Sequence, residues 1–362
     1  MTATTGTLAG AGAPPRLVSL FRAELERARS RRSLPWLTVV AVVAVVSVAT
    51  LMWFNTAHVT ADDMAAASVR YVADQQQYHD RCMADPSIPE DQRVFVCGQP
   101  ASAGDLGNAI WYLPHAPFSQ SDLEGLLAFG GGVGMLVCLM LAATTGGADW
   151  GARTIGLLLS WEPRRTRVLL VRLVVVIAVG VLVEVLVVGL ALGLGILIGE
   201  SHYLEPAMAA AVGDSAYQPV DPADAAQLAV RWIPLAALAA AGSFAMAMLT
   251  RSTGWAVGAT IGFVAVVESV VQGLWAWGSQ WLIQTNISAW LQGGIPKRVD
   301  RRAAEQSVGG MPGAGPSDGE TEAALGPGYI FISDTRALAT LAGLVIVLSL
   351  ASWASFRFRD VE

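Results

Sequence analysis

The residue types that most often do chemistry are few in this sequence, and their spacing does not suit catalysis or metal binding. Cys82 follows His79 at the spacing of half a metal site, but no second pair at ligand spacing accompanies it. Neither an H-E-x-x-H pair nor a G-x-S-x-G nucleophile elbow occurs. We therefore expect no catalytic residues and no metal ligands, and ordinary loop roles for the four histidines, His58, His79, His115 and His202.

Nucleotide hydrolysis by this chain is excluded more firmly, because the phosphate-binding loop G-x-x-x-x-G-K-[ST] requires a lysine after a glycine. The sequence has a single lysine, Lys297, and Pro296 precedes it. If the protein moves a solute uphill, the energy must come from a separate subunit or from an ion gradient.

Two glutamates, Glu184 and Glu268, stand in long apolar stretches, where an ionised carboxylate is costly. One interpretation places both on a substrate path that favours cationic amphiphiles, with Glu184 attracting a cation or binding a proton. In the other, Glu184 is a protonated or hydrogen-bonded group between helices. The residue types leave both interpretations open.

Cys82 and Cys97 are the only cysteines outside the apolar stretches, and we predict a disulfide between them. The segment that contains them is expected on the oxidising side of a membrane. Closing a loop of this length contributes about 3 kcal/mol in the chain-entropy account. The alternative is two free thiols, and Cys138 is most simply a small buried apolar residue.

Membrane-spanning helices must position these residues, because 54% of the chain is hydrophobic and only 14% is charged, against about 25% charged in soluble domains. A helix needs about 20 apolar residues to cross a bilayer. The sequence therefore predicts an all-α polytopic membrane protein with six transmembrane helices. They are expected at residues 34–56, 125–145, 168–198, 232–250, 252–274 and 337–356.

Basic residues set the predicted orientation, because short loops rich in arginine stay in the cytoplasm. Arginines mark the tail 1–33, the loop 146–167 and the final residues 357–362, so we expect both termini in the cytoplasm of a bacterial cell. The other segments, 57–124, 199–231 and 275–336, are then extracellular. In the last of these, four tryptophans within residues 275–290 favour an interfacial or re-entrant helix, and a flexible Gly- and Pro-rich loop follows.

Two amphipathic helices are expected on the cytoplasmic membrane surface. The first follows Pro15 and places Leu17, Val18, Phe21, Leu25 and Ala28 on one face. The second covers residues 149–161, where Trp150, Leu158 and Trp161 recur at helical spacing and Asp149 and Arg153 form an i,i+4 pair on the opposite side. Pro163 ends it, and Arg164 and Arg165 are placed to contact anionic headgroups.

Three glycines, Gly254, Gly258 and Gly262, share one face of the predicted fifth transmembrane helix. Small residues at this spacing permit close helix approach in membranes. They predict either a seam between two copies of the chain or close packing within one copy, and both remain open.

The arrangement resembles the ABC-2 type permeases of bacterial ABC transporters. In that family the loop between the second and third spans has an acidic residue, an aromatic, a Gly/Ser-Thr pair, a Leu-rich turn, and then a proline with basic residues. The matching positions here are Asp149, Trp150, Thr154, Leu157, Leu158, Leu159, Pro163, Arg164 and Arg165. Asp149 stands where glutamate is commoner, and Arg153 stands where glycine is common.

The resemblance implies a type V exporter-like permease with an N-terminal interfacial helix, working as a homodimer or a pair with two cytoplasmic ATPase subunits. ATP and magnesium would bind the partner, so this chain would hold no cofactor and would not itself be an enzyme. The resemblance also implies that the loop couples to the ATPase. The residues expected to do so are Asp149, Trp150, Arg153, Thr154, Leu158, Trp161, Glu162, Arg164 and Arg165.

Two other functions remain open from the residues alone. One is a gradient-driven carrier that uses Glu184, although the sequence shows no inverted repeat of the kind common in such carriers. The other is a noncatalytic membrane scaffold or sensor whose disulfide-closed outer loop binds a partner. The lipid bilayer is a partner in every case, and no nucleic acid is expected.

Overall fold

Six long helical segments form the framework of the protein, as the sequence predicts. The structure, a computed structural model, describes residues 17–99, 102, 106–151, 165–275, 277–298 and 329–358. Among these residues, six segments are long and apolar enough to cross a membrane, so the chain is a multi-pass membrane protein. They are α2 (Ser33–Asn55), α6 (Gln120–Gly151), α8 (Arg165–Ser201), α10 (Pro222–Thr250), α11 to α12 (Thr253–Leu274) and α15 (Asp334–Phe358).

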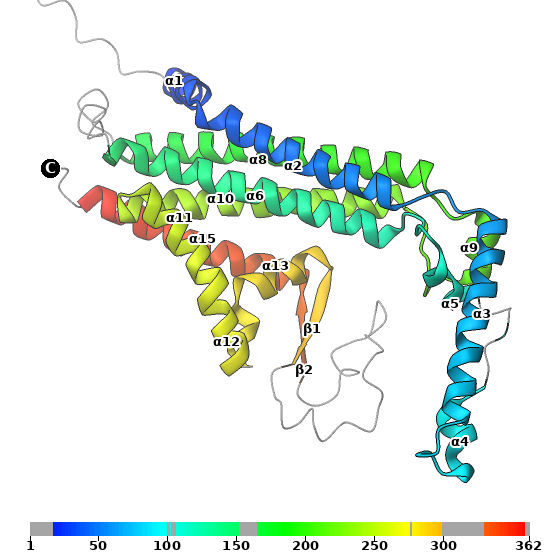
Figure 1. Cartoon of the computed structure of the whole chain (residues 1–362). Helices are drawn as coiled ribbons and strands as arrows, with labels where there is room; N and C mark the ends of the chain where they lie inside the picture. The colour runs from blue at the N-terminus through cyan, green and yellow to red at the C-terminus, as the bar shows by residue number, and fades with distance from the viewer. Residues whose placement is uncertain are drawn as a thin grey trace, which may run out of the picture.

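Helices α2, α6, α8 and α10 run side by side along one axis (Figure 1). Helix α1 (Leu17–Ser30), the predicted N-terminal amphipathic helix, lies at one end of this bundle, where α6 ends, α8 begins and α15 ends. We call this the loop end. Helix α3 (Ala61–Met83) lies at the opposite end, which we call the arm end (Figure 1).

Several helices extend beyond the predicted spans, because polar caps lengthen them past their apolar stretches. Helix α6 begins five residues before residue 125, where Ser119 and Asp122 hydrogen-bond each other's backbone N–H groups. Helix α10 begins ten residues before residue 232, with the Asp221 side chain accepting from the N–H of Ala223. A run of apolar residues shows which part of a helix can lie in lipid, whereas the capping residues set where the helix begins.

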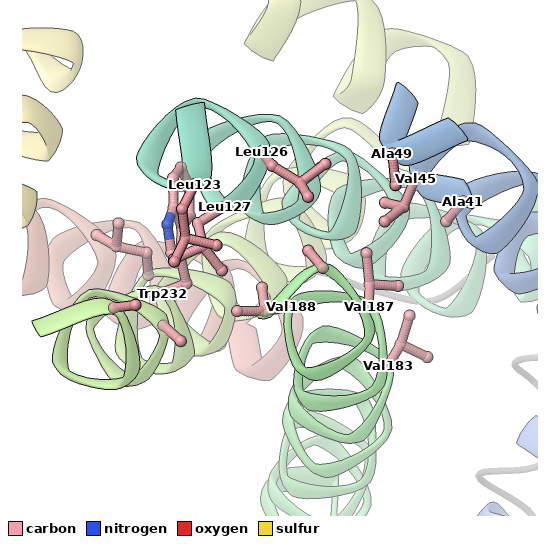
Figure 2. Close-up of a cluster of buried hydrophobic side chains, with 14 of the residues drawn as sticks. Ala41, Val45, Ala49, Leu123, Leu126, Leu127, Val183, Val187, Val188 and Trp232 are labelled. Atoms are coloured by element: carbon pink, nitrogen blue, oxygen red, sulfur yellow. The ribbon is translucent and has the colours of Figure 1, made fainter. Parts of the chain in front are cut away.

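The core of the bundle lies where α6, α8, α10 and α2 meet (Figure 2). Glycines of α6 and α8 let the helices approach: a Cβ on Gly131 would lie 2.1 Å from the Trp232 ring, and one on Gly195 would lie 2.2 Å from Leu123. The buried side chains labelled in Figure 2 come from all four helices. They are Ala41, Val45, Ala49, Leu123, Leu126, Leu127, Val183, Val187, Val188 and Trp232.

The fifth span is interrupted, whereas the sequence predicted one continuous helix over 252–274. It consists of α11 (Thr253–Gly262), the π-helical segment η2 (Phe263–Val267) and α12 (Glu268–Leu274). Figure 1 shows α11 and α12 diverging from the bundle axis. Because the extra residue of a π-helical turn changes the direction of side chains, such turns often mark functional positions.

After α12 the chain lies against the bundle again. It forms η3 (Gly278–Trp281) and α13 (Ile283–Leu291), and α13 packs on α10 and α15. A two-stranded antiparallel sheet follows, made of β1 (Gly294–Arg298) and β2 (Tyr329–Ser333). The described fold is otherwise helical, as predicted, and this small sheet was not predicted because strands so far apart in sequence leave no local hairpin signal.

The predicted outer loop 57–124 contains helices of its own at the arm end. Helix α3 starts with a capping box between Thr60 and Asp63, and α4 (Glu90–Cys97) returns beside it. The predicted disulfide between Cys82 and Cys97 is confirmed, with 5.7 Å between the two Cα atoms. Short helices complete a small apolar cluster on this side of the bundle: α5 (Leu106–Ala109), η1 (Ile110–Tyr112) and α9 (Pro206–Val212).

Candidate functional site

An apolar cavity of about 350 Å³ lies between the bundle, the fifth span and α13. Its wall includes Met135, Leu136 and Leu139 of α6, and its other residues come from α10, α11, η2, α13 and α15. The polar side chains in the wall are uncharged: Ser243, Thr260 and Gln284. The hydroxyls of Ser243 and Thr260 donate to the carbonyls of Leu139 and Ala256. The cavity is large enough for a small ligand and is suited to an apolar group.

Glu268 does not line this cavity, although we placed it on the substrate path. Its side chain is fully buried, and its two carboxylate oxygens accept the N–H groups of Ile283 and Gln284 at 2.6 and 2.9 Å. These N–H groups begin α13 and have no partner within that helix. A carboxylate also suits the positive end of a helix dipole. Glu268 therefore joins the fifth span to α13, the helix that closes one side of the cavity.

Arg231 of α10 holds the other end of α13, a role that the sequence analysis missed. Its guanidinium donates to the carbonyl of Trp290 at 2.8 Å and to that of Leu291 at 3.2 Å, and the Trp290 indole donates back to the Arg231 carbonyl at 2.7 Å. Asp334 lies 3.9 Å from the guanidinium. Opposite charges thus sit at the two ends of α13, each at the end that the helix dipole favours.

Glu184 also lies away from the cavity, in the seam where α8 faces α6. Its side chain is fully buried, and a Cβ on Gly134 would lie 2.3 Å from Oε2. Neither oxygen has a hydrogen-bond partner among the described residues. With both glutamates outside the cavity wall, its described lining offers no electrostatic preference for a cationic cargo.

The base of the loop predicted to contact an ATPase is described, but most of the loop is not. Arg153, Thr154, Leu158, Trp161, Glu162 and Arg164 lie outside the described residues. Asp149 and Trp150 belong to the last turn of α6, and Arg165 begins α8, so residues 146–151 continue the second span instead of starting the loop.

Trp150 ties the loop end of α6 to two other helices. The Arg251 guanidinium lies 4.4 Å from the centre of the Trp150 ring, and the Phe356 ring meets it edge-on at 6.3 Å. Arg251 ends α10 in the left-handed region with φ 55°, one residue before Ser252 caps α11. A displacement of the loop would therefore reach the turn between the fourth and fifth spans.

Helix α1 and Arg31, the residue that follows it, contact the two helices that flank the loop. Arg172 of α8 donates through Nε to Glu24 at 3.3 Å, in a pair that is almost fully buried. Arg31 donates to the carbonyl of Thr144 in α6 at 2.8 Å. Both arginines thus contact groups of the protein itself.

The three glycines of the fifth span face open space. A Cβ on Gly254, Gly258 or Gly262 would meet no other heavy atom within 4 Å. Large side chains near them are exposed as well, including Trp255 at 73% and Val266 at 62%. Packing against the described part of the chain therefore does not account for the glycine face.

Two histidines have hydrogen-bonding neighbours in the structure. His79 lies near the carbonyl of Cys97 at 3.5 Å, and His202 lies 3.1 Å from the Thr56 hydroxyl. Within the described ranges, no three His, Cys, Asp or Glu side chains gather as a metal would require.

Comparison with known proteins adds no identification. No protein-family model matches the sequence, and no curated protein matches it. The functional assignment of this chain therefore depends on its own residues and geometry.

Proposed function

We propose that this chain is the permease subunit of a bacterial ABC exporter, with ATP hydrolysed by a separate cytoplasmic subunit. The observation that carries the proposal is the 350 Å³ apolar cavity among membrane-length helices. A transporter needs a place for its cargo within the membrane, and a structural scaffold does not. The uncharged wall favours the apolar part of an amphiphile.

The loop-end contacts support a coupling role for residues 149–165. Trp150 links this segment through Arg251 to the start of α11, whose residue Thr260 lines the cavity. Helix α1 contacts one flank of the segment through Arg172, and Arg31, just after α1, contacts the other through Thr144. Movement of an ATPase against this segment would thus be passed to the fifth span and to the cavity. The ATPase would be present in two copies, with magnesium and ATP bound to it.

The test is purification of the tagged chain in nanodiscs from its native membrane, followed by identification of bound proteins and an ATPase assay. Replacing residues 152–164 with a Gly/Ser linker of equal length should abolish ATPase association. Replacing residues 307–319 with such a linker is the matched control and should preserve it. A purified chain that carries no ATPase and supports no nucleotide-dependent transport would overturn the proposal.

A second candidate is a gradient-driven carrier. The observation that favours it is the fully buried, unpartnered carboxyl group of Glu184, since ionisable groups inside membranes often mark ion or proton pathways. Transport in liposomes that responds to an imposed proton gradient without nucleotide, and that Glu184→Gln abolishes, would establish it in place of the first.

A further inference from the structure

The side chain of Glu184 is the least satisfied polar group in the bundle interior that the structure describes. It is fully buried, and both carboxyl oxygens are without partners. The other fully buried acid, Glu268, accepts two backbone N–H groups. A buried carboxylate without donors is much more costly than a neutral acid in the same place. Glu184 must therefore either face a cation or carry its own proton.

No cation faces Glu184 from the helices packed around it. Helix α2 contains no ionisable residue, and the two charged residues of α10, Asp224 and Arg231, lie toward its arm end. On α8 the nearest cation is Arg172, twelve residues away, which is about 18 Å along a helix. From α6 the neighbouring titratable group is the Cys138 thiol, which donates to the carbonyl of Gly180 at 3.2 Å.

The seam is closely packed around Glu184. This residue lies outside five of the best-formed cavities among the described residues. The carboxyl group occupies the space that a side chain at Gly134 would need, and a Cβ there would also lie 3.0 Å from the Glu184 carboxyl carbon. A metal cation would require several further oxygen ligands around it. The one cation that fits this space is a proton.

We propose that Glu184 is a proton-binding site within the seam between α6 and α8, holding its proton while the seam is closed and releasing it when these helices separate. In release, the carboxyl O–H bond breaks and the proton passes to water that enters the opened seam. Uptake is the reverse, and no electrons are transferred. Gly134 is the positioning residue, because its missing side chain makes the space that the acid occupies.

A second unpaired group lies one turn away along α6. The indole of Trp232 packs on Gly131, and its Nε1 is also buried without a partner. The α6 surface thus faces an unused donor at Gly131 and an unused acid at Gly134.

This inference does not depend on which energy source drives the protein. In an ATP-driven exporter, opening of the seam would be accompanied by proton release, whereas in a gradient-driven carrier the same site would be the coupling group. A chain that binds no ATPase would therefore not contradict the proton site. A chain without the proton site would likewise not contradict the ATPase proposal.

Infrared spectroscopy of the full chain in nanodiscs tests the bound proton directly. The carbonyl absorption of a protonated carboxylic acid should be present at mildly acidic, neutral and mildly alkaline pH, and Glu184→Gln should remove it. Glu200→Gln is the matched control, because Glu200 is an exposed glutamate near the end of the same helix, and it should leave the band unchanged. Identical spectra for wild type and Glu184→Gln would overturn the proposal.

Exchange into D₂O tests whether the seam is closed. The Glu184 band should shift to its deuterated position slowly, whereas a shift complete on mixing would mean an open seam and would overturn the inference. Gly134→Ala should displace the acid and move or remove the band, and Gly132→Ala should not, because a Cβ on Gly132 meets open space. If Glu184→Gln does not accumulate in the cell, the spectra of Glu184→Ala and Gly134→Ala can be used in its place to assign the carbonyl band to Glu184.

Discussion

Single charged side chains join helices whose apolar contacts alone would not fix their relative positions. Glu268 and Arg231 occupy opposite ends of α13, and Arg172 joins α1 to α8. Hydrogen bonds to charged groups are worth about 1.5–3 kcal/mol each, more than neutral ones. Because hydrogen bonds are directional, these contacts fix the orientation of the helices. Apolar packing constrains that orientation less.

Replacing Glu268 should detach the start of α13. In Glu268→Ala, two buried N–H groups lose their acceptor, and we expect a destabilisation of about 1–3 kcal/mol. Hydrogen exchange at Ile283 and Gln284 would report the loss locally. Glu124→Ala, which removes an exposed glutamate from α6, should leave that exchange unchanged. Unaltered protection of Ile283 in Glu268→Ala would contradict the capping role.

His202 should make the arm end sensitive to acid. Burial lowers the pKa of His202 below its usual value, and the nearby His58 lowers it further. Protonation therefore favours the unfolded or opened state. The stabilisation is complete above the ordinary histidine pKa of about 6.5, and it is lost as the pH falls through the lowered pKa of the folded state.

The measurement is the thermal unfolding midpoint of the detergent-purified chain across this pH range. His202→Gln should flatten the dependence, because the Thr56 contact no longer titrates. Replacement of the exposed His115 by glutamine is the control and should preserve it. Equal pH dependence in wild type and His202→Gln would refute the assignment.

At the scale of elements, glycine-mediated packing sets the distances between helices. Residues 130–134 of α6 include four glycines, and their surroundings differ. Gly131 contacts Trp232 and Gly134 contacts Glu184, whereas Gly132 faces open space. The sequence shows the glycines, but only the packing shows which of them a neighbour occupies.

Alanine at Gly131 and Gly132 should separate these roles. Gly131→Ala would place a Cβ 2.1 Å from the Trp232 ring, and overpacking of this kind costs about 1–3 kcal/mol. Gly132→Ala should be neutral or slightly stabilising, because alanine has the higher helix propensity. Unfolding in a denaturing detergent gradient measures both, and equal stability of the two variants would show that the α6–α10 contact can relax.

At the scale of the whole molecule, the fifth span has an apolar face that no other described part of the chain covers. Trp255, Val266 and Leu274 are exposed along it, and the glycines beside them have no contacts. We expect this face to form the seam of a homodimer, since small residues allow close approach between helices in a membrane.

Cysteine cross-linking in membranes tests the seam. Gly254→Cys and Gly258→Cys should each be captured as dimers by a short bifunctional thiol reagent, because both positions are open. Ala256→Cys should not be captured, since Ala256 is fully buried against α6 and α10. The native cysteines cause little background, as two form a disulfide and Cys138 is buried. Monomers from both glycine positions would contradict a homodimeric seam.

The sequence by itself determined the class of protein, the number of spans, the N-terminal helix and the Cys82–Cys97 pairing. These follow from composition, apolar run length, helical periodicity and cysteine count, which are local properties of the chain. It also singled out Glu184 and Glu268 as unusual, because a charge in an apolar run is visible without a fold.

The tertiary structure decided what those residues contact. Glu268 caps α13 and Glu184 lies alone against Gly134 because helices distant in sequence meet there. The cavity, the Arg231 contact and the β1–β2 pairing also join distant segments, so no local pattern encodes them. Periodicity fixes which elements form, whereas side-chain packing between them fixes what each buried charge faces.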